Sequence, residues 1–475
     1  MPTPYEQIQE LKKQLHCNIP DLLVEANQND PFYVGTDTEI IMAEWFAKLW
    51  RKFGYGAGVH LRRIHYSLLS RNLKKPDGQP YINTENCWQY VCKAGGYTRY
   101  LGLVDPAAFV DRKNPSPRIY HYSGYVEKPE WHSVQYSNWD LPVIGVSSDY
   151  DLSWHVPHYE VAGYHCESYK ALQPYHVEIW CEKSTMNDVL IPICSEQQVN
   201  LVTGEGFMSI TSVIRLLLRA RESGKPVRIL YISDFDPAGD VMPPSIARQI
   251  EFWLNYFGFT EDIKLTPLIL TREQVQQYKL PRIPIKEEDK RKTKFEEHYG
   301  EGAVELDALE ALYPGESARI IREAISQFRD DNLSDKICQA NETLEQRVKE
   351  AFENTIYPYQ GQLDEIEKEV EEIADRYYDR VRELNQSLQK ELEPHGRKLE
   401  SLSQDIKESI DNMDIDIPAL PEPNVQTEDD NWLFDSKRDY LEQLKYYKLH
   451  QGKTKRRKKR TAYDAETMSF KEVEE

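Results

Sequence analysis

The chain has few cysteines and no long apolar run. Its seven cysteines are scattered along 475 residues, and an odd, unclustered set is typical of reduced thiols rather than of a disulfide framework. No apolar stretch approaches the roughly 20 residues that a membrane-spanning helix needs. No positively charged start followed by an apolar core marks a signal peptide. These absences predict a cytoplasmic protein with no membrane partner.

Two further absences concern nucleotides and positive charge. No P-loop or other ATP-binding signature is present, so we expect no ATPase activity from this chain. The formal net charge is −20, which by itself argues against a nucleic-acid partner. The length leaves room for two or three domains with substantial cores.

Positive charge is nevertheless concentrated in one part of the sequence. Residues 51–118 contain twelve Lys or Arg against four Asp or Glu, with aromatic residues interspersed. Such a segment attracts the phosphate backbone of DNA, although an ordinary solvated surface can have the same composition. The residues that we expect to contact double-stranded DNA here are Arg63, Lys74, Lys75 and Arg99.

Acidic side chains follow two segments that have the composition of buried strands. Asp234 and Asp236 end the apolar run 229–233, and Glu182 ends the run 177–181. Strand and helix patterns alternate from residue 177 to residue 270, which favours a parallel sheet with right-handed crossovers. All three acids then fall on the carboxyl edge of one sheet, where ligands of such sheets bind. Clustered carboxylates repel one another unless a cation such as Mg²⁺ lies between them.

Three other interpretations of the acid pair explain less. An EF-hand calcium loop beginning at Asp234 would need oxygen ligands where Ala238 and Ser245 stand. An aspartyl-phosphate phosphatase, with Asp234 as nucleophile, leaves Glu182 without a role. Helix capping at a turn accounts for one carboxylate, but not for three at one edge.

This pattern resembles a Toprim domain, the metal-binding fold of topoisomerases, bacterial primases and several nucleases. It is most similar to the topoisomerase VI A subunit and the related meiotic double-strand-break transesterase. The resemblance covers roughly residues 40–325, and it rests on residues 177–183, 201–207, Arg215, 234–239 and 304–309. It implies that Glu182, Asp234 and Asp236 hold Mg²⁺, with Asp240 and Lys183 as weaker candidates, and that Arg215 contacts DNA.

The same resemblance implies a tyrosine nucleophile in an upstream winged-helix-like domain. Tyr66 lies four residues after Arg62, as the motif of the family requires, and His65 stands where the family has an aromatic residue. A tyrosine oxygen that attacks phosphorus keeps the energy of the phosphodiester in a covalent link. We therefore expect Tyr66, Arg62 and Glu182 to be catalytic. An ordinary half-buried tyrosine is the alternative for Tyr66, since the chain has 30 tyrosines.

The last third of the chain is predicted to be helical. Apolar residues recur at spacings of three and four from Leu363 to Leu388 and again from Leu399 to Met413. Pro394 and Gly396 interrupt the pattern, so we expect two antiparallel coiled-coil helices joined at that break. A further amphipathic helix is expected from Trp432 to His450. Seven of the eight residues 453–460 are positively charged, which predicts a disordered basic tail that binds DNA.

Together these patterns predict an α/β plus α protein. Its expected parts are a winged-helix-like DNA-binding domain (1–172), a parallel-sheet Toprim domain (173–335), a coiled-coil hairpin (336–413), an acidic linker (414–430) and a C-terminal helix with a basic tail (431–475). The resemblance implies a homodimer, and strand passage would need a separate ATPase subunit.

Three functions remain open at this stage. The first is Mg²⁺-dependent DNA cleavage through a covalent bond to Tyr66. The second is a Toprim endonuclease that uses water as the nucleophile, of the plasmid or phage defence type. The third is a non-catalytic DNA-binding scaffold.

Overall fold

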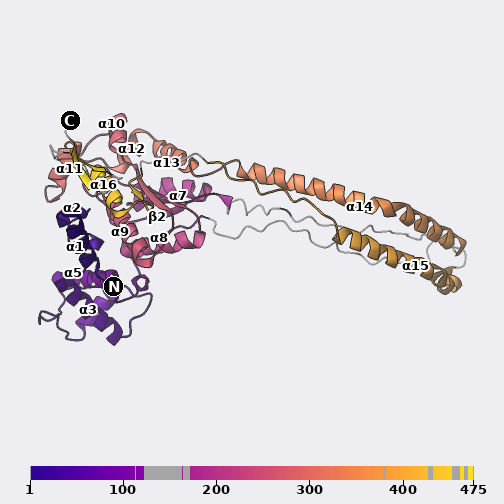
Figure 1. Ribbon diagram of the computed structural model, residues 1–475, viewed down its shortest axis with the longest axis horizontal. Helices are drawn as coiled ribbons and strands as arrows, with labels where there is room; N and C mark the ends of the chain where they lie inside the picture. The colour runs from indigo at the N-terminus through magenta and orange to yellow at the C-terminus, as the bar shows by residue number, and fades with distance from the viewer. Residues whose placement is uncertain are drawn as a thin grey trace. The chain divides into compact units, whose positions relative to one another are not determined.

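The computed structural model describes residues 2–112, 114–121, 163, 172–377, 381–425, 432–451, 460–464 and 469–473. The chain forms two compact units (Figure 1). The first unit comprises residues 1–123, 173–329 and 424–475, and the second comprises residues 124–172 and 330–423. Each is described separately below.

A five-stranded sheet in the order β2–β1–β3–β4–β5 lies at the centre of the first unit. The first four strands pair in parallel, and β5 adds to the edge of β4 in antiparallel orientation. The predicted parallel sheet is therefore confirmed. The strands are β1 (His176–Cys181), β2 (Asn200–Thr203), β3 (Val227–Ile232), β4 (Ile263–Ile269) and β5 (Phe434–Asp435).

Helices cover both faces of this sheet. Alternate residues of β1 enter opposite cores, because successive side chains of a strand point to opposite faces. Ile179 packs with α7 (Asn187–Glu196), α12 (Leu306–Leu312) and α13 (Glu316–Ser326). Trp180 packs with α8 (Ile210–Ser223), α9 (Met242–Phe257) and α16 (Tyr440–His450). Such double coverage is required for a sheet whose strands are buried on both sides.

The connections reverse direction at β1 and β3. From β1 the chain crosses to β2 on one side through α7, and from β3 it crosses to β4 on the other side through α9. The carboxyl ends of β1 and β3 thus border the topological switch point, which is the usual ligand site of open α/β sheets. The elements beyond β4 are α10 (Arg272–Gln277) and α11 (Lys292–Tyr299).

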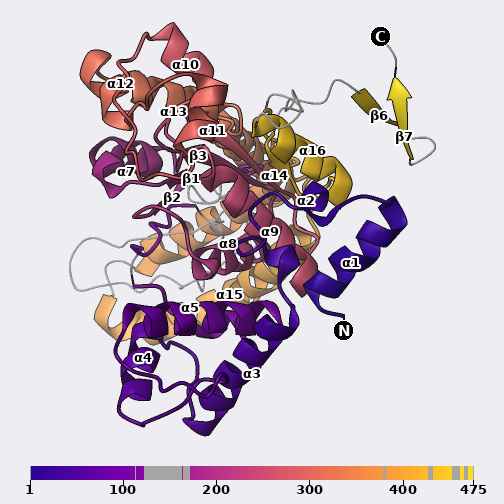
Figure 2. The ribbon, with the colours of Figure 1, turned by 90° about the vertical axis from the view of Figure 1, so that its left-hand side faces the viewer.

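The N-terminal part of the first unit is helical. Its main helices are α3 (Asp37–Lys52), α4 (Leu61–Leu69) and α5 (Glu85–Tyr100), which share one core built around Phe46, Ile64 and Val91. Thr36 and Thr84 cap α3 and α5, as their short hydroxyl side chains favour. Figures 1 and 2 show these helices below α8, whereas α10–α13 lie above the sheet.

The two ends of this unit meet on α9. Arg248 of α9 is completely buried, and its guanidinium bonds to the Asp30 carboxylate at 3.2 Å and to the Tyr440 hydroxyl at 2.6 Å. Asp30 follows α1 (Pro4–Leu15) and α2 (Ile19–Leu22), while Tyr440 begins α16. One cation therefore joins segments more than 400 residues apart. Glu251 completes its charge balance at 3.0 Å.

The C-terminal segment differs from the predicted helix. Trp432 to Asp435 pass along the edge of β4, where Phe434 and Asp435 form β5, and α16 begins only at Tyr440 after its cap Asp439. The predicted helix start at Trp432 is therefore wrong. Phe434, Leu444 and Tyr447 are buried. Of the basic tail, residues 453–459 lie outside the described residues, and residues 460–464 pair with 469–473 as the ribbon β6–β7.

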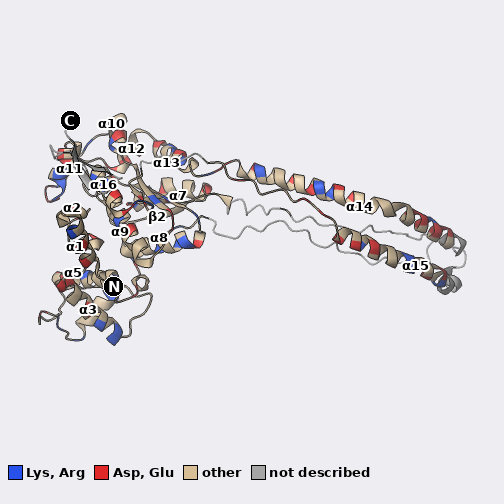
Figure 3. Cartoon of the chain, in the orientation of Figure 1, with Lys and Arg blue, Asp and Glu red and all other residues tan. Residues whose placement is uncertain are grey.

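The second unit contains two long helices, α14 (Leu333–Tyr377) and α15 (Val381–Asp411). They run antiparallel, since Tyr359 contacts Ser409 at 2.7 Å and Arg347 contacts Asp416 at 2.9 Å. Their facing apolar residues form one core. Figure 3 shows Asp and Glu residues gathered toward the C-terminal part of α14. Among the described residues, none of the helices is both long enough and apolar enough to cross a bilayer.

The predicted break at Pro394 is wrong, because α15 continues through it. Leu388, Leu392, Leu399 and Leu402 are buried on either side of this proline. Their spacing keeps the apolar face in phase, so packing against α14 offsets the hydrogen bond that proline removes. The two helices are instead separated at residues 378–380, which lie outside the described residues.

Candidate metal and cleavage site

Glu182 and Asp234 lie at the switch point of the sheet. Each follows its strand by one or two residues, and the backbone N–H of Asp234 donates to Oε1 of Glu182 at 3.1 Å. The Asp234 carboxylate is also close enough to raise the pKa of the Glu182 carboxyl group by its charge. The prediction from strand order, that these acids meet at one edge, agrees with this geometry.

Glu182 is short of partners for a buried carboxylate. Its side chain is only 5% exposed, and its Oε2 atom has no hydrogen-bond partner among the described residues. Burial, followed by the nearby Asp234 carboxylate, raises the pKa of Glu182 to about 8. A carboxyl group in this state binds a proton or a cation more readily than an exposed one does.

Asp236 lies in the same loop, but its carboxylate bonds to the backbone of that loop. Its Oδ1 accepts hydrogen bonds from the backbone of Ala238 at 2.8 Å and of Gly239 at 2.6 Å, which shapes the turn into α9. Gly239 is required in this turn, since a Cβ there would lie 2.0 Å from the Asp234 carbonyl oxygen. Burial raises the pKa of Asp236, and the charge of Asp234 adds to the increase.

Lys183 neutralises part of the acidic cluster. Its Nζ lies 2.5 Å from Oδ2 of Asp234 and also contacts the Glu305 carboxylate. Burial lowers the pKa of Lys183, but the two ion pairs outweigh burial and raise it. Oδ1 of Asp234 accepts from the backbone N–H of Leu306 at 2.8 Å. Both oxygens of Asp234 therefore have protein partners, which is the strongest argument in the structure against a cation at Asp234.

The donor set fits Mg²⁺ in chemistry but only partly in geometry. Hard carboxylate oxygens suit this ion, and the unpartnered Oε2 of Glu182 offers it one ligand. Within the part of the chain that the structure describes, no three His, Cys, Asp or Glu side chains are arranged as a metal site. A cation shared by Glu182, Asp234 and Asp236 would need Lys183 to leave Asp234 and Asp236 to turn from its own loop.

Asp240, a weaker candidate ligand, does not join the acids. Its Oδ1 accepts a hydrogen bond from the Tyr299 hydroxyl at 2.7 Å, and it lines the side of a neighbouring pocket formed by His298 and His450, a pocket that Asp234 also borders.

Tyr66 is exposed on the N-terminal helical part. The side chain is 62% accessible on α4, and Arg62 and Arg63 lie four and three residues earlier on the same face. Arg62 is held above the ring of Trp88 at 5.7 Å. None of the three acids contacts Tyr66 within the chain, so the structure does not bring these two halves of the predicted site together.

His65 takes the structural place of an aromatic residue. It is buried, its Nδ1 lies 2.6 Å from the Tyr81 hydroxyl, and its ring packs against Tyr66, Tyr81 and Trp88. The His65 ring therefore packs beneath Tyr66 as an aromatic side chain would.

The predicted DNA contacts fall into two groups. Arg63 and Lys74 are exposed, Lys75 is partly exposed beside Asp77, and Arg215 is partly exposed on α8. The prediction that Arg99 contacts DNA is wrong. It is only 6% exposed, and its guanidinium bonds to the Pro106 carbonyl and to Thr211 and lies over the Phe109 ring. Arg99 joins α5 to α8 and is not available to DNA.

Sequence reasoning missed three residues near the acids. Glu305 pairs with Lys183, Arg291 interacts with Asp236, and Val304 forms a backbone bridge with Phe235. The resemblance includes residues 304–309, but it does not indicate that this segment contacts the end of β3. No protein-family model matches this chain, and no curated protein sequence matches it, so the likeness to Toprim proteins rests on the motifs quoted above.

Proposed function

We propose that the protein is a Mg²⁺-dependent DNA-cleaving enzyme that forms a covalent bond to DNA through Tyr66. The observation that carries the proposal is the pair Glu182 and Asp234 at the switch point of a parallel sheet, with one buried carboxylate oxygen unpartnered. Structural acids of this burial normally have their hydrogen bonds satisfied. The other support is the exposed Tyr66 beside two arginines.

In this proposal the phenolic oxygen of Tyr66 bonds to a phosphorus of the DNA backbone. The bond from that phosphorus to a deoxyribose oxygen breaks, and the phenolic proton ends on the leaving oxygen. Arg62 and Arg63 stabilise the phenoxide and the phosphate. Glu182, Asp234 and Asp236 would hold Mg²⁺, which supplies positive charge for the phosphoryl oxygens.

A second copy of the chain would complete such a site. Tyr66 and the acids do not meet within one chain, so a homodimer in which each tyrosine approaches the other subunit's acids fits the geometry. Such an enzyme would act on double-stranded DNA in the cytoplasm. Passage of one duplex through another would need a separate ATPase subunit.

The test is covalent capture of DNA. Supercoiled plasmid is incubated with the protein and Mg²⁺, the reaction is stopped with detergent, and cut DNA is sought in the protein phase before and after protease. Tyr66→Phe should abolish capture, because it removes only the attacking oxygen. Glu182→Gln should lower capture by at least about 100-fold, the scale of losing charge stabilisation in phosphoryl transfer.

Two matched controls sharpen this experiment. Tyr357 is 82% exposed on α14 and Asp307 is exposed beside Leu306, so Tyr357→Phe and Asp307→Asn change similar groups that the proposed mechanism does not use. Both should leave capture unchanged. Capture that persists in Tyr66→Phe would refute the tyrosine mechanism.

A second candidate is a metal-dependent endonuclease that uses water. The separation of Tyr66 from the acids within one chain favours it. This enzyme would cut plasmid without becoming linked to it, would tolerate Tyr66→Phe and would lose activity in Asp234→Ala. A third candidate, the DNA-binding scaffold, is favoured by the ion pair between Lys183 and Asp234. It predicts DNA binding with no cutting by any variant.

A further inference from the structure

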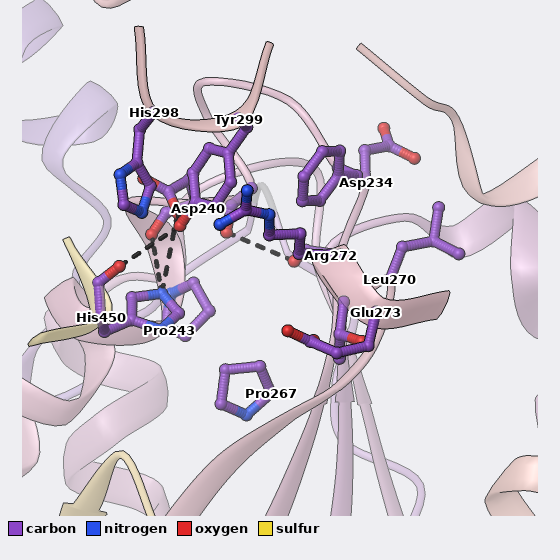
Figure 4. Close-up of a pocket in the computed structure, with 14 residues that line it drawn as sticks. Asp234, Asp240, Pro243, Pro267, Leu270, Arg272, Glu273, His298, Tyr299 and His450 are labelled. Carbon is purple, nitrogen blue, oxygen red and sulfur yellow. Dashed lines mark hydrogen bonds and ion pairs between the residues drawn. The ribbon is translucent and has the colours of Figure 1, made fainter. Parts of the chain in front are cut away.

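A pocket of about 330 Å³ opens beside the acidic edge of the sheet (Figure 4). It lies where β3 and β4 end and α9 begins, and residues from α11 and α16 close its far side. Asp234 lines it, but Figure 4 shows the Asp234 carboxylate directed away from the hollow. The pocket and the acidic cluster are therefore neighbours that share the end of β3.

The polar side of the pocket is held in place by one group of hydrogen bonds. The Tyr299 hydroxyl lies 2.7 Å from Oδ1 of Asp240 and 3.2 Å from the His450 carbonyl oxygen. Nε2 of His450 lies 3.3 Å from the Asp240 carbonyl oxygen. Three chain segments thus fix the position of the Asp240 carboxylate before any ligand enters.

Oδ2 of Asp240 is left without a hydrogen-bond donor among the described residues. The Asp240 side chain is 19% exposed, so this oxygen can accept a hydrogen bond from a ligand. Burial lowers the pKa of His450, which disfavours the charged form of its imidazole. The polar side therefore presents the Asp240 carboxylate as an acceptor and favours a ligand that carries a donor group.

Part of the remaining lining is apolar. Pro243, Pro267 and Leu270 line the pocket together with the rings of His298 and Tyr299 (Figure 4). The rim is formed by Arg272 and Glu273, both exposed at the start of α10. Proteins hold a nucleobase that has left its stack between aromatic or apolar side chains, with hydrogen bonds to its polar edge. The volume lies at the lower end of the roughly 300–1,000 Å³ found for ligand pockets, as one nucleoside requires.

We propose that this pocket binds a nucleobase that carries an amino group, with Asp240 accepting from the amino group and Arg272 contacting the adjoining phosphate. Adenine, guanine and cytosine carry such an amino group. Thymine carries none, and its ring N3–H lies between two carbonyl oxygens that the Asp240 carboxylate would repel. That the base belongs to the DNA strand cut at the neighbouring acids rests on the proposed function; binding of the base itself does not.

The probes for this proposal are the four deoxynucleoside monophosphates, without Mg²⁺. Their dissociation constants with the full-length protein are measured by ligand-observed NMR. The monophosphates dAMP, dGMP and dCMP should bind at least about tenfold more tightly than dTMP, the factor that one charge-assisted hydrogen bond provides. Absence of saturable binding by all four up to about 10 mM would overturn the proposal.

Variants at the pocket test the two contacts separately. Asp240→Asn should reverse the preference toward dTMP, because the Tyr299 hydroxyl holds the amide oxygen and turns the amide N–H toward the ligand. Arg272→Ala should weaken all four ligands by a similar factor, roughly three- to tenfold. Its matched control is Glu273→Ala at the same rim, which should not weaken any of them.

The results separate this proposal from the proposed function. Nucleotide binding with the expected preference, in a protein that does not cut DNA, would support the pocket and refute cleavage. Cleavage by a protein that binds none of the four nucleotides would do the reverse. A base preference unchanged in Asp240→Asn, with the melting temperature of the variant also unchanged, would overturn the assignment to Asp240.

Discussion

Two glutamates on the same strand of the sheet have opposite surroundings. Glu178, inside β1, accepts hydrogen bonds from Arg219, His176, Trp180 and Asn200. Glu182, just past the end of β1, receives one backbone hydrogen bond and keeps one oxygen unpartnered. Both side chains are almost fully buried, at 0% and 5% exposed.

Their pKa values shift in opposite directions for this reason. Burial alone raises the pKa of Glu178, but Arg219 and His176 outweigh it and bring that pKa well below its usual value. Burial and Asp234 raise the pKa of Glu182 to about 8. The comparison teaches that burial alone does not set the pKa of an acid, whereas the number and charge of its donors decide the direction of the shift.

The largest expected difference is in stability. Glu178→Gln leaves the Arg219 charge buried without its partner, so it should lower the free energy of unfolding by about 3–5 kcal/mol. Glu182→Gln removes no comparable ion pair and should be neutral or stabilising at pH 7. Urea unfolding followed by circular dichroism measures both. Equal losses of unfolding free energy in the two variants would contradict the difference between Glu178 and Glu182.

The next effect is a loss of stability as pH rises, caused by Glu182. A folded-state pKa of about 8, above the usual 4.5, means that folding favours the protonated group. Its contribution is complete below pH 4.5 and is largely lost as the pH rises through 8, by on the order of 4 kcal/mol. Wild-type protein in EDTA should show this loss relative to Glu182→Gln. A constant difference between pH 5 and pH 8 would contradict it.

A loss of stability as the pH falls is expected from His121, which lies near Glu178. The His121 ring stacks on His176 at 4.4 Å, and burial lowers the pKa of His121 to about 3. Folding then favours neutral His121, so stability falls as the pH drops below 6.5, by about 2 kcal/mol at pH 5. His121→Phe keeps the stacking but cannot titrate. Unfolding at pH 7.5 and pH 5 should show a smaller loss in this variant than in wild type.

The smallest effect expected is the response to Mg²⁺. An ion at about ten times its dissociation constant stabilises the folded state by about 1.4 kcal/mol. Thermal unfolding of wild-type protein should shift upward accordingly, and Glu182→Gln should abolish the shift. A shift of the same size in both proteins would place the ion elsewhere.

Much of the sheet and its acidic edge followed from sequence pattern. Apolar runs that ended at Glu182 and Asp234, separated by amphipathic helices, were enough to predict parallel strands and a shared edge. Those signals are local and periodic, and the topology of parallel sheets does the rest.

The remaining features depend on tertiary contacts that composition does not encode. Arg99 looked like a surface cation, but a long side chain can reach Thr211 in the core. Pro394 was expected to end a helix. Instead α15 continues through it, because the leucines on either side of this proline are buried. The sequence pattern places Asp236 and Lys183 at the acidic edge of the sheet. Their hydrogen-bond and ion-pair partners depend on the folded structure.

The bonds of Arg248 to Asp30 and Tyr440 have a consequence for synthesis of the protein. Tyr440 leaves the ribosome after both long helices of the second unit, since α14 and α15 precede it in the chain. Domains generally fold as units during translation. Arg248, which is buried in the first unit, therefore lacks the Tyr440 hydroxyl until the chain is almost complete. A nascent chain stalled before residue 432 should therefore be far more sensitive to protease around α9 than the released protein.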